Sequence, residues 1–257
     1  MDKIMGFMES AVAGAAKMAL AKKGRLAFRR HKDAHDFVTD ADLAVEKYVV
    51  GRIRGEFPSH SVYSEEMGGL EGKSKGDLWI LDPIDGTNNY SFGLPLWGVS
   101  LAYAKNGIVQ AGAIAIPELG LAFCARKGKG AYCNGRKIRV SKRSKLSDCL
   151  VLFESRLARS ADRKRIRALF DVSRKAFGIR VLGVAVFNFG FVALGSADIS
   201  IMSGLKVVDF AAGALIVEEA GGKVTDLSGG KWNLGTADFA VSNGRVHRQI
   251  LEIKGGK

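Results

Sequence analysis

The stretch Leu81-Asp82-Pro83-Ile84-Asp85-Gly86-Thr87 places two carboxylates three positions apart, where the apolar run of residues 78–81 gives way to turn residues. Mg²⁺ prefers oxygen ligands and usually binds through one or two carboxylates together with waters and substrate phosphates. Pro83 restrains the backbone, so the Ile84 carbonyl can be directed toward the same point. The stretch therefore predicts a magnesium site. A hairpin turn is the alternative, because Asp-Gly after a strand is a strong turn signal.

Three other acidic positions extend this prediction. Glu65 and Glu66 follow a turn-rich stretch, and Asp209 lies far downstream. Together with the two aspartates these carboxylates are numerous enough for more than one metal ion. Structural roles also fit them: Asp209 could be a helix N-cap, and the glutamates could be exposed loop acids. Asp42, three residues after Thr39, fits a capping box, which does not exclude a functional role.

Periodicity divides the chain into two halves. Residues 1–22 and 39–54 are expected to be helices, and residues 77–132 alternate apolar runs with turns, as an antiparallel sheet does. Strands are expected at residues 96–103, 108–116 and 121–125. After residue 145 strands and helices alternate, with strands at 149–154, 179–182, 199–202, 223–226 and 239–242, and helices at 160–170, 184–194, 209–219 and 245–253. We therefore expect an N-terminal α+β domain at residues 1–144 with most metal ligands, and a C-terminal α/β domain at 145–257 that contributes Asp209.

Composition is that of a folded protein: 257 residues, 47% hydrophobic and 25% charged, with a net charge of +13. No nucleic-acid-binding signature accompanies the basic clusters, so they are expected to attract anionic substrates. A non-catalytic, basic nucleic-acid-binding protein is a distant alternative. Charged residues interrupt the apolar segment 1–22, which favours an amphipathic helix in a cytoplasmic protein over a signal peptide or membrane span.

Three other features are expected to carry no chemistry. His31 and His35 are spaced for a metal site if helical, but solvated loop residues are the favoured interpretation. Residues 68–74 resemble a phosphate-binding P-loop, yet their glycines are one residue too close. Without metal-type spacing or a disulfide framework, inert thiols are expected at Cys124, Cys133 and Cys149.

Ordered motifs across the chain resemble those of the inositol monophosphatase family, within the fructose-1,6-bisphosphatase superfamily of Mg²⁺-dependent phosphatases. They are Thr39-Asp40-Ala41-Asp42, Ser64-Glu65-Glu66, Asp82-Pro83-Ile84-Asp85-Gly86-Thr87-Asn88-Asn89-Tyr90, Val208-Asp209-Phe210-Ala211-Ala212-Gly213 and Glu218-Glu219-Ala220-Gly221-Gly222. The resemblance implies a layered αβαβα sandwich of the sugar phosphatase type, with N-terminal helices on an antiparallel sheet and a C-terminal mixed α/β layer. It also implies a homodimer, a small phosphorylated substrate, and no nucleic-acid or membrane partner.

The resemblance further implies roles for single residues. Two or three Mg²⁺ ions would be held by Glu65, Asp82, the Ile84 carbonyl, Asp85 and Asp209. One ion would acidify a water that Glu65 and Thr87 orient toward phosphorus, with Asp42 fixing Thr87 through a hydrogen bond. The backbone N–H groups of Gly86 and Thr87 would hold the phosphate beside Asp85, and a second ion would stabilise the leaving alkoxide.

Departures from the family pattern affect the expected substrate. Inositol phosphatases of this type usually carry Glu where this chain has Met202, Trp where it has Val208, and Gly-Ser/Thr-Ala where it has Gly183-Val184-Ala185 after Arg180. Arg180 and Lys206 could instead pair with a second phosphate. The pattern resembles archaeal and thermophile-type members that hydrolyse both fructose 1,6-bisphosphate and inositol 1-phosphate. A 3'(2'),5'-bisphosphate nucleotidase and an NADP phosphatase are the alternatives.

Overall fold

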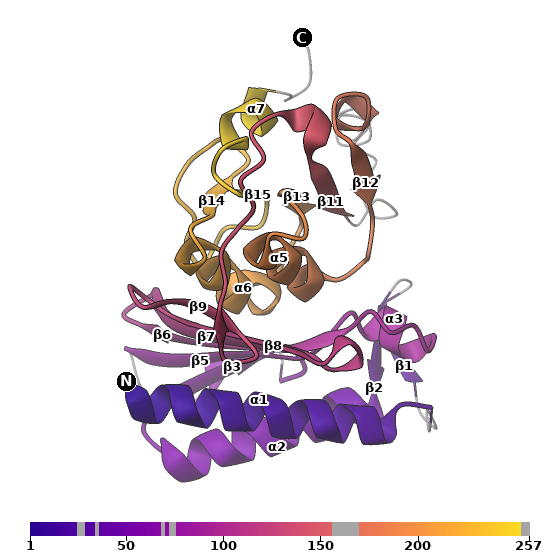
Figure 1. The fold of residues 1–257 in the computed structure, drawn as a ribbon. Coiled ribbons are helices and arrows are strands. Elements are labelled where there is room, and N and C mark those ends of the chain that lie inside the picture. The colour runs from indigo at the N-terminus through magenta and orange to yellow at the C-terminus, as the bar shows by residue number, and fades with distance from the viewer. Residues whose placement is uncertain (25–28, 34–35, 68–69, 72–75, 156–169, 253–257) are drawn as a thin grey trace.

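The computed structural model describes residues 1–24, 29–33, 36–67, 70–71, 76–155 and 170–252. Its elements stack in five layers (Figure 1): a helix pair, an eight-stranded sheet, a second helix pair, a five-stranded sheet and a short terminal helix. The outer pair is α1 (Asp2–Lys22) and α2 (Asp40–Glu56), the inner pair is α5 (Ala185–Leu194) and α6 (Val207–Glu219), and the terminal helix is α7 (His247–Glu252). This order confirms the expected αβαβα sandwich.

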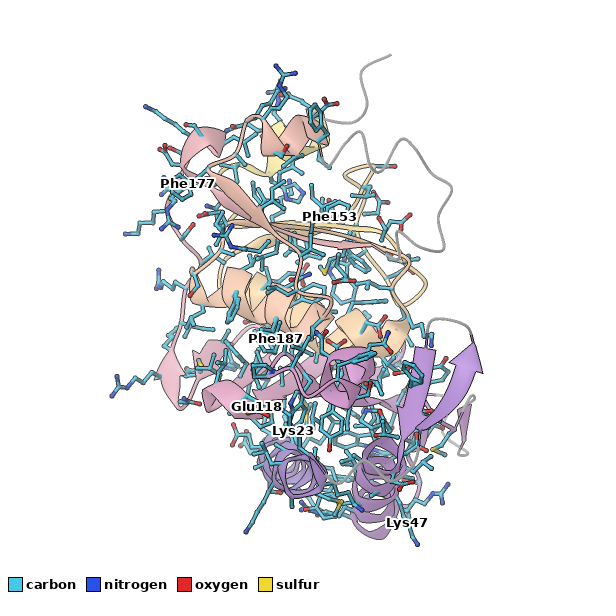
Figure 2. The ribbon with its side chains drawn as sticks, turned by 90° about the vertical axis from the view of Figure 1, so that its right-hand side faces the viewer. Lys23, Lys47, Glu118, Phe153, Phe177 and Phe187 are labelled. Atoms are coloured by element: carbon cyan, nitrogen blue, oxygen red, sulfur yellow. The ribbon has the colours of Figure 1, made fainter. Side chains whose placement is uncertain are left out.

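The outer helices form because their apolar residues recur at helical spacing. The buried face of α1 includes Ile4, Met8, Ala11, Ala15 and Ala19. By length and composition α1 is also apolar enough to cross a membrane, and here its apolar face packs on α2 and the first sheet. The two helices cross closely, since a Cβ at Gly14 would lie 2.1 Å from the Tyr48 hydroxyl oxygen. Figure 2 shows Lys23, at the end of α1, forming an ion pair with Glu118.

The first sheet has the strand order β10-β9-β8-β7-β6-β5-β3-β4. Its neighbouring strands are antiparallel except for the parallel pair β3 and β5. The strands are β3 (Ser61–Ser64), β4 (Leu70–Glu71), β5 (Asp77–Asp85), β6 (Gly98–Lys105), β7 (Ile108–Ile116), β8 (Leu121–Arg126), β9 (Gly130–Cys133) and β10 (Arg136–Lys137). The three strands expected by range are confirmed. A separate hairpin joins β1 (Arg29–Asp33) and β2 (Asp36–Thr39).

The hairpin interpretation of residues 81–87 is wrong. Strand β5 continues to Asp85 with a register irregularity after Asp82, and the short helix α3 (Thr87–Ser91) follows at once. The Asp-Gly pair does mark the end of the strand, as expected. However, the chain passes from strand to helix instead of returning as the next strand.

The second sheet is mixed, with the strand order β12-β11-β13-β15-β14. Parallel pairs join β11 to β12 and β13, whereas β15 is antiparallel to both of its neighbours. The strands are β11 (Leu150–Ser155), β12 (Gly178–Arg180), β13 (Ile199–Ser203), β14 (Lys223–Asp226) and β15 (Phe239–Ser242). These strands and the helices α5, α6 and α7 confirm the expected pattern. The helix expected at residues 160–170 falls almost entirely outside the described residues.

The inner helices fill the space between the two sheets. Figure 2 shows Phe187 of α5 in this layer, and it is fully buried. Helix α6 lies directly on the first sheet, because a Cβ at Gly112 would be 2.9 Å from the Cα of Ala212. One apolar cluster therefore runs from the first sheet to the second. The domain boundary near residue 144 falls between β10 and β11 and stays a prediction.

The cysteines are free thiols, as expected. Cys133 and Cys149 are buried, and burial raises the pKa of Cys149 to about 11. Burial, followed by a hydrogen bond to Glu9, raises the pKa of Cys124 to about 12. Within the P-loop-like stretch 68–74 the structure describes only β4, and the rest of the stretch and the side chains of His31 and His35 lie outside the described residues.

Candidate active site

The end of β5 carries the two aspartates of the opening motif. Asp82 is fully buried and pairs with Ser100 of β6, while Asp85 follows the irregularity and is 9% exposed. Gly86 then adopts φ 85°, the left-handed region that favours glycine. A Cβ there would lie 2.6 Å from Val184 Cγ2 and 3.0 Å from the Leu96 carbonyl oxygen. Glycine is therefore required for this strand-to-helix turn.

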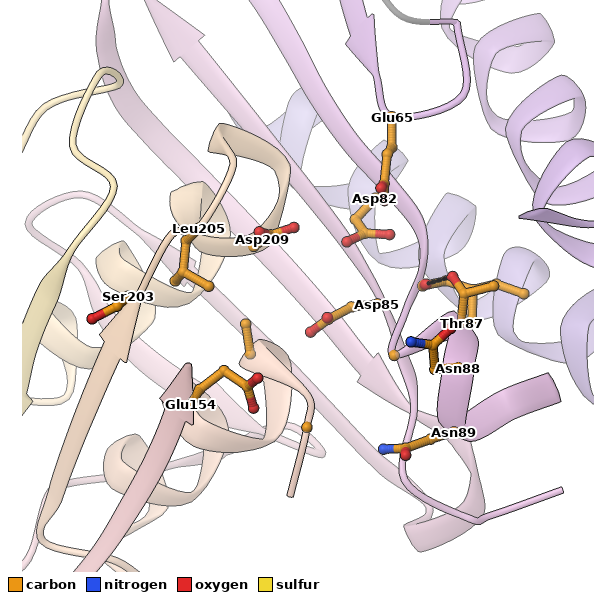
Figure 3. A pocket seen from close by; sticks show the side chains of 14 residues that line it. Glu65, Asp82, Asp85, Thr87, Asn88, Asn89, Glu154, Ser203, Leu205 and Asp209 are labelled. Carbon is orange, nitrogen blue, oxygen red and sulfur yellow. Dashed lines mark hydrogen bonds between the residues drawn. The ribbon is translucent and has the colours of Figure 1, made fainter. Parts of the chain in front are cut away.

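Long-range topology brings two more carboxylates to Asp82. Strands β3 and β5 are parallel with Ser64 opposite Leu81, so Glu65 leaves β3 at the level where Asp82 leaves the regular part of β5. Asp209, in the first turn of α6, approaches from the inner helix layer. One carboxylate oxygen from each of Glu65, Asp82 and Asp209 lies within 4.8 Å of the others. Figure 3 shows these side chains turned toward a common centre, with Asp85 beside them.

The electrostatics of the cluster are those of crowded, buried acids. Burial raises the pKa of Asp82 well above its ordinary value, and the neighbouring charges of Glu65 and Asp85 add to the shift. Burial and the charge of Asp209 likewise raise the pKa of Asp85, opposed by a 2.5 Å hydrogen bond from the Val186 N–H. Ionised carboxylates this close repel one another, and a bound cation would offset that repulsion.

The residues fit a hard divalent cation. Both carboxylate oxygens of Asp82 are buried, and neither has a hydrogen-bond partner among the described residues. Buried polar atoms normally have a partner, so these two oxygens indicate a ligand. The surrounding donors are carboxylate oxygens, which suit Mg²⁺ better than metals that prefer nitrogen or sulfur.

The environment of Thr87 links the site to the outer helices. Its hydroxyl oxygen lies 2.8 Å from the Ile84 carbonyl oxygen and 3.1 Å from Asp42 Oδ1. Asp42 Oδ2 at the same time accepts a 2.8 Å hydrogen bond from the Thr39 N–H, completing a capping box on α2. The helix-cap role and the contact with Thr87 therefore coexist in one carboxylate.

Asp209 also has a structural contact. Its Oδ2 accepts a 2.7 Å hydrogen bond from the Lys206 N–H at the start of α6. The helix begins at Val207 with Lys206 as its N-cap, so Asp209 occupies the third helical position, three residues after the N-cap position where it was expected. Its position in the carboxylate cluster is compatible with this contact.

The residues that were expected to bind substrate do not all line the pocket. Gly183 and Ala185 line the pocket, and Val184 is buried against Gly86. Lys206 Nζ lies 3.0 Å from Glu65 Oε1. Arg180 is exposed on β12, donates to the Ile179 carbonyl and is outside the pocket lining. Its role in binding a second phosphate stays a prediction.

Two acidic residues at the site were missed by sequence reasoning. Glu154, at the end of β11, lines the pocket from the second sheet. Glu46 of α2 is buried, and its Oε2 accepts hydrogen bonds from the Ser64 hydroxyl, the Glu66 N–H and the Met67 N–H. It therefore holds the loop that carries Glu65. The only sequence signal for Glu46 is its position one helical turn after Asp42.

The carboxylates open onto a pocket of about 310 Å³ (Figure 3). Its lining is mostly polar and includes Asn88 and Asn89 from α3 and Ser203 from β13. This volume is at the lower end for small-molecule sites. The arrangement can hold cations beside a small, polar, anionic ligand.

Comparison with known proteins agrees with this geometry. The sequence profile of the inositol monophosphatase family matches residues 1–254. The chain belongs to this family. Relatives in this family include proteins named as phosphatases, and this chain is a phosphatase.

Several members of the inositol monophosphatase family are similar to this chain. The fructose-1,6-bisphosphatase/inositol-1-monophosphatase of Thermotoga maritima is 39% identical over 219 residues, which are 85% of this chain and 82% of that protein. A putative Nus factor SuhB of Neisseria meningitidis is 38% identical over 224 residues, covering 86% and 85%. The crystal structure of the extragenic suppressor protein suhB from Bartonella henselae matches with a TM-score of 0.94 at 30% identity, covering 98% of each chain.

Proposed function

We propose that this protein is a Mg²⁺-dependent phosphomonoesterase of small sugar and polyol phosphates, with fructose 1,6-bisphosphate and inositol 1-phosphate as its substrates. The observation that carries the proposal is the pair of buried oxygens of Asp82, which have no hydrogen-bond partner in the described part of the chain and lie within a cluster of carboxylates at a small polar pocket. The similarity to the dual-activity enzyme of Thermotoga maritima supports the choice of substrates.

The metal ligands in this proposal are Glu65, Asp82, the Ile84 carbonyl, Asp85 and Asp209. When bound, two or three Mg²⁺ ions would neutralise the phosphate charge, acidify a water and stabilise the leaving alkoxide. Among the described residues, Glu65, Asp82 and Asp209 already have ligand atoms within 4.8 Å of one another.

The side chains around the metals would position the nucleophile. Thr87 and Glu65 would orient the attacking water, and Asp42 would act as acceptor for the Thr87 hydroxyl, 3.1 Å away. The N–H groups of Gly86 and Thr87, at the start of α3, would bind phosphate oxygens. Positioning and charge neutralisation supply most of the rate in such phosphoryl transfers.

The proposal also covers the binding of a second phosphate, the cellular compartment, the oligomeric state and the partners of the protein. Lys206, beside Glu65 at the site, would pair with a second phosphate, and Arg180 would do so from the edge of the second sheet. We further infer that the protein acts in the cytoplasm as a homodimer. No nucleic-acid partner is required for this chemistry, although relatives named as Nus factors make such a partner testable.

The test is phosphate release by the purified protein with Mg²⁺ from fructose 1,6-bisphosphate, inositol 1-phosphate, 3'-phosphoadenosine 5'-phosphate and NADP. Preference for the first two supports the proposal. Preference for a nucleotide keeps the metal site and replaces the substrate with that of a nucleotidase or an NADP phosphatase. Absence of phosphate release, together with tight and salt-dependent RNA binding, would favour the binding-protein alternative.

A further inference from the structure

A further acidic residue, Glu154, lines the pocket and has no role in the proposed chemistry. Figure 3 shows the Glu154 side chain pointing from the end of β11 into the pocket, toward Asp85, with Thr87 on the opposite side of the pocket. Its charge contributes to the raised pKa of Asp85, which places the two carboxyl groups within electrostatic reach. Glu154 therefore borders the space on the side of the pocket opposite Thr87.

Glu154 is separate from the metal-binding cluster. Among the described residues, the group whose ligand atoms all lie within 4.8 Å consists of Glu65, Asp82 and Asp209, and both Asp85 and Glu154 lie outside it. Asp82 lies in the first sheet, Glu65 directly follows its strand β3 and Asp209 lies in α6, whereas Glu154 belongs to the second sheet. A position across the pocket from the cluster suits contact with the organic part of a substrate.

Few polar side chains of the second sheet line the pocket. Glu154 stands opposite Met202 in the parallel pair of β11 and β13, so both side chains emerge on the same face of the sheet. Met202 is fully buried in the apolar cluster around the inner helices and provides at most a weak acceptor. Glu154 and the nearby Ser203 are thus the polar side chains that this sheet contributes to the pocket lining.

The chemistry of a carboxylate limits what it can bind. An ionised glutamate only accepts hydrogen bonds, and its two oxygens can serve two neighbouring hydroxyl groups. Such charge-assisted O–H···O⁻ bonds are stronger than those between neutral groups. The same charge repels a phosphate or carboxylate placed beside it. This side of the pocket therefore favours an uncharged carbon skeleton bearing hydroxyl groups.

We propose that Glu154 is a specificity-determining residue that accepts hydrogen bonds from hydroxyl groups of the polyol leaving group next to the scissile phosphate. The proposal rests on the phosphatase function proposed above and defines the substrate class of the same pocket. A second phosphate of a bisphosphate substrate would then lie away from Glu154, on the side of Lys206.

The experiment compares inositol 1-phosphate with p-nitrophenyl phosphate, whose leaving group has no aliphatic hydroxyl. In Glu154→Ala we expect the ratio of kcat/KM for inositol 1-phosphate to that for p-nitrophenyl phosphate to fall about tenfold or more, mainly through KM. Glu154→Gln keeps one acceptor oxygen without the charge and should give an intermediate ratio. The Mg²⁺ concentration for half-maximal activity should stay within about twofold of wild type.

The exposed Asp148→Asn is the matched control, since it removes an acid just before β11 and should leave the ratio unchanged. Thermal unfolding identifies a variant that has lost its fold, in which case Glu154→Gln decides. An unchanged ratio in folded variants, or a shift in Mg²⁺ requirement without a change in ratio, overturns the role of Glu154 and leaves the phosphatase proposal standing. A wild-type protein that releases phosphate from neither substrate overturns both.

Discussion

Lys206 Nζ lies 3.0 Å from Glu65 Oε1, so a lysine from the start of α6 forms an ion pair with a carboxylate of the proposed metal cluster. This contact joins the inner helix layer to the loop after β3 across 141 positions of sequence. The side chain of Glu65 is 12% exposed and that of Lys206 is 42% exposed, so the lysine can turn outward when the glutamate takes another partner. A cation and Lys206 would compete for the same oxygen.

Replacing Lys206 should therefore have opposite effects on metal binding and on the binding of a bisphosphate substrate. In Lys206→Met we expect half-maximal activation at a Mg²⁺ concentration about two- to fivefold lower, because a nearby positive charge is removed. KM for fructose 1,6-bisphosphate should rise more than KM for inositol 1-phosphate, since only the former has a second phosphate. Activity titrations with both substrates measure this, with the exposed Lys142→Met as the control. Equal changes in the two KM values would contradict a role for Lys206 at the second phosphate.

Glu46 is expected to act as a positioning residue for Glu65. Its buried carboxylate accepts one hydrogen bond from Ser64 at the end of β3 and two from the backbone of the loop that carries Glu65. In Glu46→Gln, the loss of charge and of acceptor capacity should raise the Mg²⁺ requirement and lower kcat about tenfold. Activity against Mg²⁺ concentration is the measurement, and Glu56→Gln at the exposed end of α2 is the control. A variant that loses stability but keeps the wild-type Mg²⁺ requirement would show that Glu46 supports only the fold.

Gly86→Ala should damage the strand-to-helix turn through both conformation and contact. The residue has φ 85°, and an added Cβ would lie 2.6 Å from Val184 Cγ2. We expect a loss of about 1–3 kcal/mol in the free energy of unfolding, with loss of activity. Gly93→Ala is the matched control, because Gly93 has φ 78° and nothing within 4 Å of its Cβ position. Chemical denaturation measures the free energy of unfolding of both variants, and the difference between their losses is the steric contribution at Gly86. If the double variant with Val184→Ala recovers nothing, contact with Val184 is not the cause.

The buried acids should make the metal-free protein less stable as pH rises. The pKa of Asp82 is raised in the folded state above its ordinary 3.8, so the native protein binds more protons than the unfolded chain in the interval between the two values. Stability therefore falls as pH increases through that interval. With a chelator at pH 7, we expect Asp82→Asn to melt about 2–4 °C above wild type, and the difference to shrink toward pH 4.

The same measurement tests metal binding directly. Mg²⁺ should raise the melting temperature of wild type and not that of Asp82→Asn, because a ligand that binds only the folded state stabilises it. Scanning calorimetry with and without Mg²⁺ gives both values, and Asp148→Asn should behave as wild type. A lower melting temperature for Asp82→Asn in chelator would mean that Asp82 has a stabilising partner in the metal-free protein.

Much of this fold was predictable because its signals are local. The alternation of apolar runs and turns marked β7 within its observed limits, Ile108–Ile116. The helical spacing of apolar residues marked α1 and α5 within a residue of their observed limits. Asp82 and Asp85 were recognisable as candidate ligands, since both lie in one short motif. In each case the residues that define the feature are neighbours in sequence.

Other features depend on contacts between distant elements and could not be predicted in this way. The turn at Gly86 required knowledge of Val184 packing on it, and so the hairpin alternative remained open. Glu46 resembles any polar residue of an amphipathic helix until the fold places the Glu65 loop beside it. Glu154 enters the pocket where β11 lies beside β13, and the alternation of strands and helices does not say which strands pair or which side chains reach the pocket.

The central claim is that metal ions held by this carboxylate cluster are required for phosphate release. Its most direct test is the rate of phosphate release from inositol 1-phosphate as a function of Mg²⁺, in wild type and in Asp85→Asn. We predict saturable activation of wild type, abolished by excess chelator, and a rate at least about a hundredfold lower in Asp85→Asn. Phosphate release that is unchanged in Asp85→Asn or in the presence of chelator would contradict the claim.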